Sequence, residues 1–132
     1  MSGLSVDASA IVSILALADG WTDLSDRLER SRPRYTSAIA VWEATAALTR
    51  LRSSAHADEA IAALLAAAQI DIVAIMASTG HAAAAAHRRY GRGRRPARLN
   101  MGDGFSYACA KALGVPLLYK GGDMALTDIA TV

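Results

Sequence analysis

Residues 4–15 read LSVDASAIVSIL, and this stretch decides the fold. A short apolar run from Leu4 to Val6 ends at Asp7. Apolar side chains then recur at helical spacing from Ala8 to Leu15. We therefore predict a strand that passes directly into a helix, with Asp7 at the junction.

The rest of the chain continues this alternation of strand and helix. We predict helices over residues 8–18, 21–30, 38–51, 53–68, 78–90 and 102–113, and strands over 35–37, 70–75, 115–119 and 129–132. Thr22 is the expected N-cap of the second helix. The expected fold class is α/β, a three-layer α/β/α sandwich with a mostly parallel central sheet, formed by residues 1–132 as one domain.

Composition limits the cell compartment and the core. The chain has one Phe, so a core of Ala, Leu, Ile and Val is expected. The single Cys109 excludes an intramolecular disulfide and fits a reducing compartment. No basic start precedes Asp7, and the longest apolar run, Ala60 to Ala68, is too short to span a membrane. We expect a soluble, cytoplasmic protein with no membrane partner.

Charge is distributed unevenly along the chain. The formal net charge is +2. Residues 81–98 contain no acid and six arginines, namely Arg88, Arg89, Arg92, Arg94, Arg95 and Arg98. Without these six, eight basic residues face twelve acidic ones. The segment mixes arginine with Tyr90 and flexible glycines, a pattern typical of RNA binding, although a solvated loop is the alternative.

Four acidic residues are candidates for a catalytic or metal-binding site. Asp7 follows the first strand, and Asp123 follows the strand at 115–119 after a two-glycine turn. Asp103 opens the helix before that strand, and Glu43 is the only charged residue between Arg34 and Arg50. In parallel sheets, ligands bind beyond the carboxyl ends of the strands.

Each acid also has a purely structural interpretation. Asp7 and Asp103 are suited to cap helices, and Asp123 is suited to a turn. Glu43 is harder to explain, because burying a charge in an apolar helix is costly unless it is paired or metal-bound. Four carboxylates at one edge would repel one another, and Mg²⁺ or Mn²⁺ would relieve that repulsion. The histidines lack zinc-like spacing, and no serine–histidine pair stands out.

Four blocks of the sequence resemble the conserved blocks of VapC toxins, ribonucleases with a PIN domain. The blocks are VDASA at 6–10, WEA at 42–44, LNMGDGFSYA at 99–108, and YKGGDM at 119–124 with LTDI at 126–129. They come in the family's order and extend over essentially the whole chain. The pairing of Asn-x-Gly-Asp with a later Gly-Asp-x-x-x-Thr-Asp is the most specific part.

The resemblance implies a PIN-like fold, dependence on Mg²⁺ or Mn²⁺, endonuclease action on RNA as the toxin of a type II toxin–antitoxin system, and neutralisation by a VapB-like antitoxin. It makes Asp7, Glu43, Asp103 and Asp123 the catalytic and metal-binding acids, with Asp7 and Asp103 as the leading metal ligands. Ser9, Thr127 and Asp128 are expected to line the pocket, or, for the last two, to pin the final turn.

The sequence departs from the family at Gly122, where relatives often carry Asp or Asn, and at Met124, where an aromatic is common. Gly122 removes one carboxylate and puts a second metal position in doubt. The apolar helices over residues 8–18 and 38–51 are expected to supply interfaces for a homodimer and for the antitoxin.

Two other functions fit parts of the pattern. A PIN module without catalytic activity would bind RNA or a protein, but its site would have lost acids, and all four are present. A phosphoacceptor receiver domain shares the length and layout. It needs an acidic pair after the first strand and an Asp after the central one, whereas Asp7 is single and Met76 follows Ile75.

Overall fold

The structure is a computed structural model that describes residues 3–91, 93 and 97–132. Its four described strands form one parallel sheet in the order β3-β2-β1-β4. The strands are β1 (Leu4–Val6), β2 (Arg34–Ser37), β3 (Ile70–Val73) and β4 (Leu117–Leu118). β1 and β2 are central, so the segments that follow them, at Asp7 and Ala38, begin at neighbouring points of the carboxyl edge.

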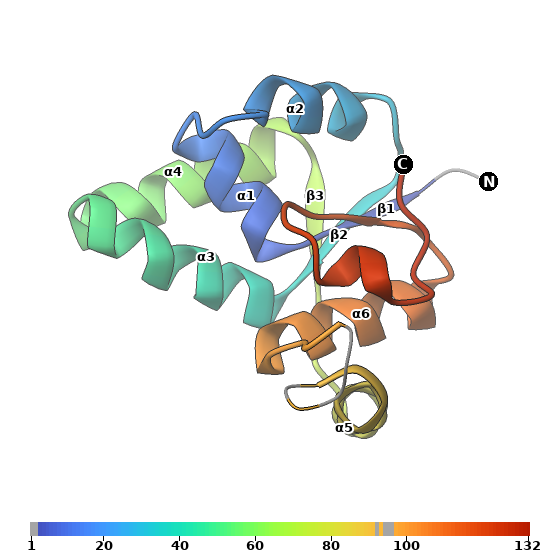
Figure 1. Cartoon of the computed structure of the whole chain (residues 1–132). Helices are drawn as coiled ribbons and strands as arrows, with labels where there is room; N and C mark the ends of the chain where they lie inside the picture. Colours follow the sequence, from blue (N-terminus) through green and yellow to red (C-terminus); the bar gives the residue numbers. More distant parts are fainter. Residues whose placement is uncertain (1–2, 92, 94–96) are drawn as a thin grey trace.

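Helices cover both faces of the sheet (Figure 1). They are α1 (Ala8–Leu15), α2 (Trp21–Glu29), α3 (Ala38–Leu51), α4 (Ser54–Ala67), α5 (Ala77–Tyr90) and α6 (Met101–Leu113), with a short 3-10 helix η1 (Met124–Leu126). Figure 1 shows α1 to α4 on one side and α5 and α6 on the other. The predicted α/β/α architecture is confirmed.

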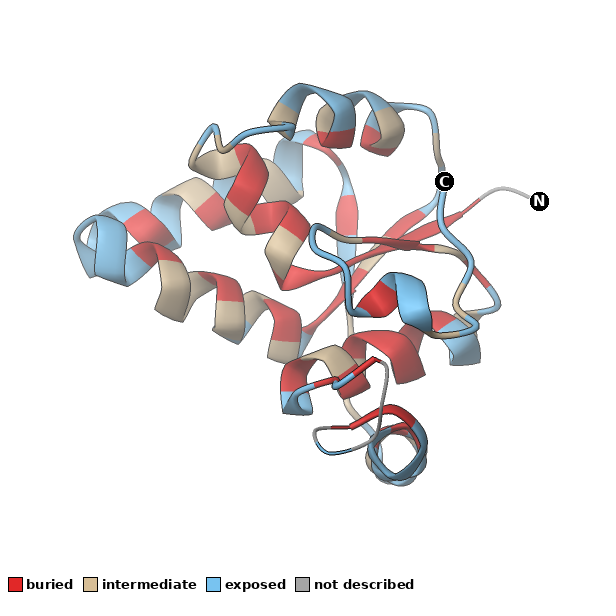
Figure 2. Cartoon of the chain, in the orientation of Figure 1, coloured by how far each residue is buried: buried red, intermediate tan, exposed pale blue. Residues whose placement is uncertain are grey.

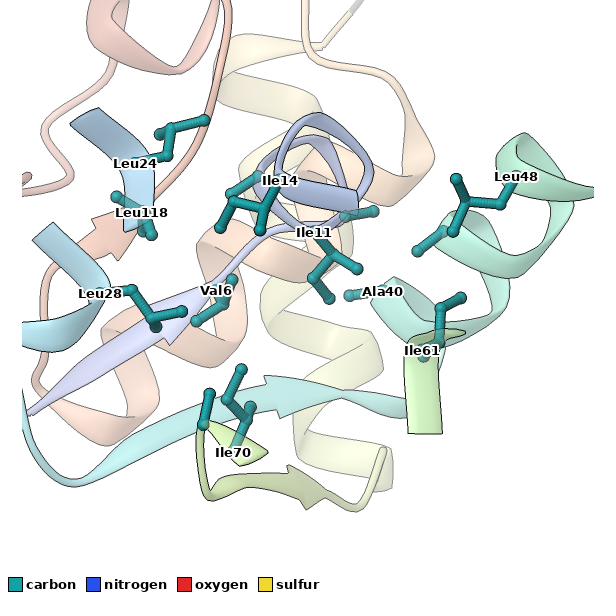
Figure 3. Close-up of a cluster of buried hydrophobic side chains, with 14 of the residues drawn as sticks. Val6, Ile11, Ile14, Leu24, Leu28, Ala40, Leu48, Ile61, Ile70 and Leu118 are labelled. Carbon is teal, nitrogen blue, oxygen red and sulfur yellow. The ribbon is translucent and has the colours of Figure 1, made fainter. Parts of the chain in front are cut away.

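Two buried apolar clusters separate the layers. Figure 2 shows where the buried residues lie, and Figure 3 shows the cluster that contains Leu118. Leu118 packs into the cluster beneath α1 to α4, whereas its neighbour Leu117 packs into the cluster beneath α5 and α6. Successive side chains of a strand point to opposite faces, so even this two-residue strand joins both clusters. Ile72 is exposed because β3 is an edge strand.

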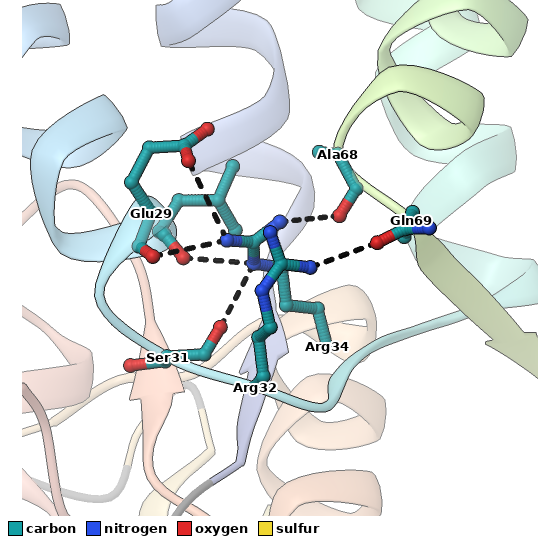
Figure 4. A network of polar contacts seen from close by, with 7 residues as sticks. Glu29, Ser31, Arg32, Arg34, Ala68 and Gln69 are labelled. Atoms are coloured by element: carbon teal, nitrogen blue, oxygen red, sulfur yellow. Dashed lines mark hydrogen bonds and ion pairs between the residues drawn. The ribbon is translucent and has the colours of Figure 1, made fainter.

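Arg34 is a charged residue within this interior, and only 1% of its surface is exposed. Its guanidinium donates to the carbonyl oxygens of Leu28 at 2.8 Å and Ala68 at 2.5 Å, as well as to those of Glu29 and Ser31. The Glu29 carboxylate lies 3.7 Å away (Figure 4). Burial of the charge is tolerated because its donors are satisfied, and the network ties β2 to the ends of α2 and α4.

Several predicted boundaries are wrong. The first helix ends at Leu15, because Leu17 takes a left-handed backbone angle, φ 53°. Gly20, not Thr22, is the N-cap of α2. Residues 129–132 do not form a strand, although Leu117 N–H donates to the Ala130 carbonyl oxygen at 2.9 Å. The strands predicted at 70–75 and 115–119 shorten to β3 and β4.

In the part of the chain that the structure describes, no helix is long and apolar enough to cross a membrane.

Candidate active site

Asp7 lies between β1 and α1, and its carboxylate is buried. Oδ2 accepts the Ser9 N–H at 3.0 Å and the Ser9 hydroxyl at 2.5 Å. Oδ1 accepts the Ser106 hydroxyl at 2.5 Å. Asp7 is therefore the N-cap of α1, as one interpretation of the sequence had it, and also an anion held in place by two serines.

Glu43 lies in the first half of α3, with its side chain half-buried. Its carboxylate packs directly against Gly102 of α6. A Cβ atom added to Gly102 would stand 1.9 Å from Glu43 Oε2, so the approach requires glycine. Burial, and then the charges of Asp7 and Asp103, raise the pKa of Glu43 to about 7.

Asp103 is the third residue of α6 and forms a capping box with Asn100. Its N–H donates to Asn100 Oδ1 at 2.8 Å, and its Oδ2 accepts the Asn100 N–H at 3.1 Å. The positive end of the helix dipole favours a carboxylate at this position. Asp103 lies on α6 between Gly102, which contacts Glu43, and Ser106, which contacts Asp7.

The structure thus brings together three of the four predicted acids. Asp123 is exposed at the start of η1, and it is not among the carboxylates that raise the pKa of Glu43. The loop that carries it is nevertheless anchored to the site, because Lys120 N–H donates to Ser9 Oγ at 2.9 Å. The role of Asp123 stays a prediction.

Oxygen-rich carboxylates fit Mg²⁺ or Mn²⁺, and the accumulated negative charge would be offset by such an ion. Among the described residues, no group of three or more His, Cys, Asp or Glu side chains is arranged to hold a metal ion as it stands. For Asp7, Glu43 and Asp103 to share one ion, their side chains would therefore have to rearrange. The three histidines are exposed.

The arginine segment is only partly described. Arg92, Arg94 and Arg95 lie outside the described residues. Arg88 and Arg98 are exposed. The Arg89 guanidinium stacks on Tyr90, 4.8 Å from the ring centre, and lies 3.8 Å from the Asp128 carboxylate. Arg89 therefore interacts with groups of the protein itself.

Thr127 and Asp128 make the contacts expected if they pin the last turn. Thr127 Oγ donates to the Met124 carbonyl oxygen at 2.7 Å and accepts the Ile129 N–H at 3.2 Å. Asp128 accepts hydrogen bonds from the Tyr107 hydroxyl and from Lys111. These bonds, with that from Tyr107 first, lower the pKa of Asp128.

Ser106 and Gly102 are site residues that the sequence analysis missed. Both lie within one turn of Asp103 on α6. Gly102 and Ser106 are four residues apart, so they share one face of the helix, and this face is directed towards Glu43 of α3 and Asp7 after β1. The helical periodicity around Asp103 was therefore a signal for Ser106. Nothing in the sequence indicated that Glu43 would approach Gly102.

Comparison with known proteins assigns the chain to a family. A PIN domain family model matches residues 4–130. Ribonuclease VapC30 of Mycobacterium tuberculosis is 39% identical over 127 residues, which is 96% of either chain. The crystal structure of VapC20 from the same organism, a toxin that cleaves the sarcin-ricin loop, superposes with a TM-score of 0.76 at 21% identity and covers 98% of either chain. VapBC2 from Rickettsia felis, bound to a promoter DNA fragment, superposes with a TM-score of 0.66 at 12% identity, covering 87% of this chain and 85% of that one.

The protein is thus an α/β protein with a parallel sheet, and it carries three interacting acids, Asp7, Glu43 and Asp103, in its candidate site. The chain belongs to the PIN-domain family. Within that family, the similarity over nearly the whole chain is to VapC ribonucleases.

Proposed function

We propose that this protein is a ribonuclease toxin whose Mg²⁺- or Mn²⁺-dependent site is built on Asp7, Glu43 and Asp103. One observation carries the proposal: three segments distant in sequence bring Asp7, Glu43 and Asp103 close enough for their charges to interact. Glu43 contacts α6 at Gly102, Asp7 contacts it at Ser106, and Asp103 lies between these two positions. Bringing like charges together destabilises the folded state, and such an arrangement is typical of a functional site.

Each side chain has a distinct part in the proposed reaction. Asp7 and Asp103 would hold the ion, Asp7 in an orientation set by Ser9 and Ser106 and Asp103 at the start of α6. Glu43 would complete or support the ligand set and orient a water molecule near the scissile phosphate. When bound, the divalent ion supplies a more acidic water and stabilises negative charge on the phosphodiester. Asp123 would enter from the loop after β4.

A VapB-like antitoxin is the proposed protein partner, and the active form is proposed to be a homodimer. Large apolar side chains lie exposed on the predicted interface helices. Trp42 and Leu51 of α3 are 67% and 64% exposed, and Leu17 after α1 is 64% exposed. Large exposed apolar side chains on these helices are candidates for contact with a protein partner.

The test is cleavage of total RNA by the antitoxin-free protein, with Mg²⁺ or Mn²⁺ and with chelator. We expect discrete fragments that disappear with chelator and with Asp7→Asn. Asp58→Asn changes an exposed acid on α4 and should leave cleavage intact. Intact RNA from folded, metal-saturated protein would favour the catalytically inactive PIN module. Cleavage that persists in Asp7→Asn would show a contaminating nuclease.

A further inference from the structure

A groove of about 390 Å³ leads away from the acidic site between α1 and α3. It begins at Glu43 and passes Val12 and Ala47. Its other polar lining comes from Arg50, Lys120 and the hydroxyl-bearing residues of α1. Figure 1 shows α1 and α3 side by side where they leave the sheet. The groove is therefore continuous with the site rather than a separate cavity.

Helical spacing sets the length of the groove. Glu43, Ala47 and Arg50 are at positions i, i+4 and i+7 of α3, so they share one face of the helix. Seven residues of α-helix rise about 10 Å.

The two cationic residues of the groove lining are Arg50 and Lys120. Among the residues that the structure describes, no carboxylate forms an ion pair with Arg50 or Lys120. The Lys120 ammonium donates to the Asp19 carbonyl oxygen, and its backbone N–H is bonded to Ser9. The groove lining thus contains two cationic residues and one carboxylate, that of Glu43, so the part of the groove away from Glu43 favours an anion.

We infer that this groove is a phosphate subsite for single-stranded RNA, in which Arg50 and Lys120 bind backbone phosphates on one side of the scissile bond. The inference rests on the proposed nuclease function and adds the path of the strand. Arg50 suits this role because guanidinium binds phosphate through two parallel hydrogen bonds. Val12 and Ala47 give the apolar floor that a sugar or base can contact.

A protein segment fits the groove less well. The apolar lining consists of small or short side chains, whereas the anchors of protein interfaces are large buried apolar groups. The exposed Trp42 and Leu51 of the same helix are not part of the groove lining. Charge and shape therefore favour a polyanion here and leave protein contacts to other faces of α3.

The experiment measures binding without cleavage. Protein carrying Asp103→Asn, in Mg²⁺, is titrated against a fluorescent single-stranded RNA of defined sequence, and fluorescence anisotropy is followed at several salt concentrations. We expect Arg50→Ala to weaken binding about tenfold and to reduce the salt dependence by about one phosphate contact. Arg52→Ala is the matched control, because Arg52 is exposed at the end of the same helix and bonds His56 outside the groove.

A second measurement locates the phosphate. Neutral methylphosphonate linkages are placed one at a time on either side of the cleavage position. We expect one linkage to weaken binding as much as Arg50→Ala does, and to have no further effect in that variant, since the two changes remove the same contact. Thermal melting confirms that each variant is folded.

The outcomes separate this inference from the proposed function. If the parent protein binds RNA but Arg50→Ala changes neither its affinity nor its salt dependence, the phosphate subsite is wrong and the nuclease proposal stands. The same result with an altered oligomeric state in size-exclusion chromatography would assign the groove to a protein contact. If the Asp103→Asn protein does not bind RNA and the unsubstituted protein does not cleave it, the proposed function itself fails.

Discussion

The hydroxyl of Ser106 lies 2.5 Å from Oδ1 of Asp7, across 99 residues of sequence. Ser9 holds the other oxygen of the same carboxylate. Both oxygens of a buried acid are thus oriented by the protein itself. Positioning of this kind limits the geometries that Asp7 can offer to a ligand.

Replacing Ser106 with Ala should therefore loosen Asp7. The buried carboxylate loses one charge-assisted hydrogen bond, which costs about 1.5–3 kcal/mol of unfolding free energy. We expect Mn²⁺ affinity, measured by calorimetry, to fall about tenfold or more, as for other residues that orient metal ligands. Ser106→Thr keeps the hydroxyl and should restore much of the affinity. Equal affinities in the Ala variant and the parent protein would show that Ser106 only fills space.

Gly102→Ala should damage the site while the fold survives. The new Cβ would stand 1.9 Å from Glu43 Oε2. That oxygen ends a flexible side chain, so Glu43 can turn away at low cost in stability. The carboxylate then leaves its place beside Asp7 and Asp103. We expect RNA cleavage to drop at least tenfold with little change in melting temperature.

Gly104→Ala is the matched control for Gly102→Ala. Its Cβ would meet the Ala83 carbonyl oxygen at 3.5 Å, which is ordinary van der Waals contact. Replacing Gly with Ala inside a helix stabilises it by about 1 kcal/mol. We expect normal cleavage and a slightly higher melting temperature. A comparable loss of cleavage in both variants would mean that α6 as a whole, and not Glu43, is being disturbed.

The sequence was sufficient for the architecture because local and global signals agree. The apolar run at Leu4–Val6 and the helical spacing after Asp7 produce β1 and α1, and the same alternation recurs to β4. Boundaries were less predictable. α1 ends early because Leu17 turns left-handed, and residues 129–132 accompany β4 through one backbone bond without becoming a strand. Tertiary packing determines where these helices and strands end, and the local sequence pattern does not contain that information.

The site was predicted in type more fully than in geometry. Asp7 and Glu43 come together because they follow the neighbouring parallel strands β1 and β2, and Asp103 joins them from the start of α6. Asp123 is exposed in the turn after β4, and its part in the site stays a prediction. Arg34 was not predicted as a structural residue, because its partners are backbone carbonyl groups, which leave no mark in the sequence.

Arg34 should be among the most sensitive positions for stability. Truncation to Ala removes the donor to four buried or partly buried carbonyl groups at once. Breaking such a buried network typically costs about 3–5 kcal/mol. We expect a correspondingly lower urea midpoint, with Arg34→Lys intermediate. Arg30→Ala, at an exposed position after α2, should change stability by less than about 0.5 kcal/mol. An Arg34→Ala protein as stable as the parent would contradict this assignment.

Glu43 should make the metal-free protein less stable as pH rises. Its pKa is raised in the folded state from 4.5 to about 7, so between these values the folded protein binds more protons than the unfolded chain. The destabilisation is absent below pH 4.5, grows as pH rises and is complete above pH 7. Because Glu43 is half-buried, solvent screening reduces the effect to about 1–2 kcal/mol.

Glu43→Gln tests this relation directly. Without the charge, the metal-free variant should be more stable than the parent at pH 8 and closer to it at pH 5, as measured by urea unfolding with chelator present. Glu59→Gln changes an exposed acid of α4 and should show no such pH dependence. Saturating Mg²⁺ should stabilise the parent more than the Gln variant at pH 8, since an ion that binds only the folded state offsets the same repulsion. A Gln variant that is less stable than the parent at pH 8 would show that Glu43 has a partner that compensates its charge.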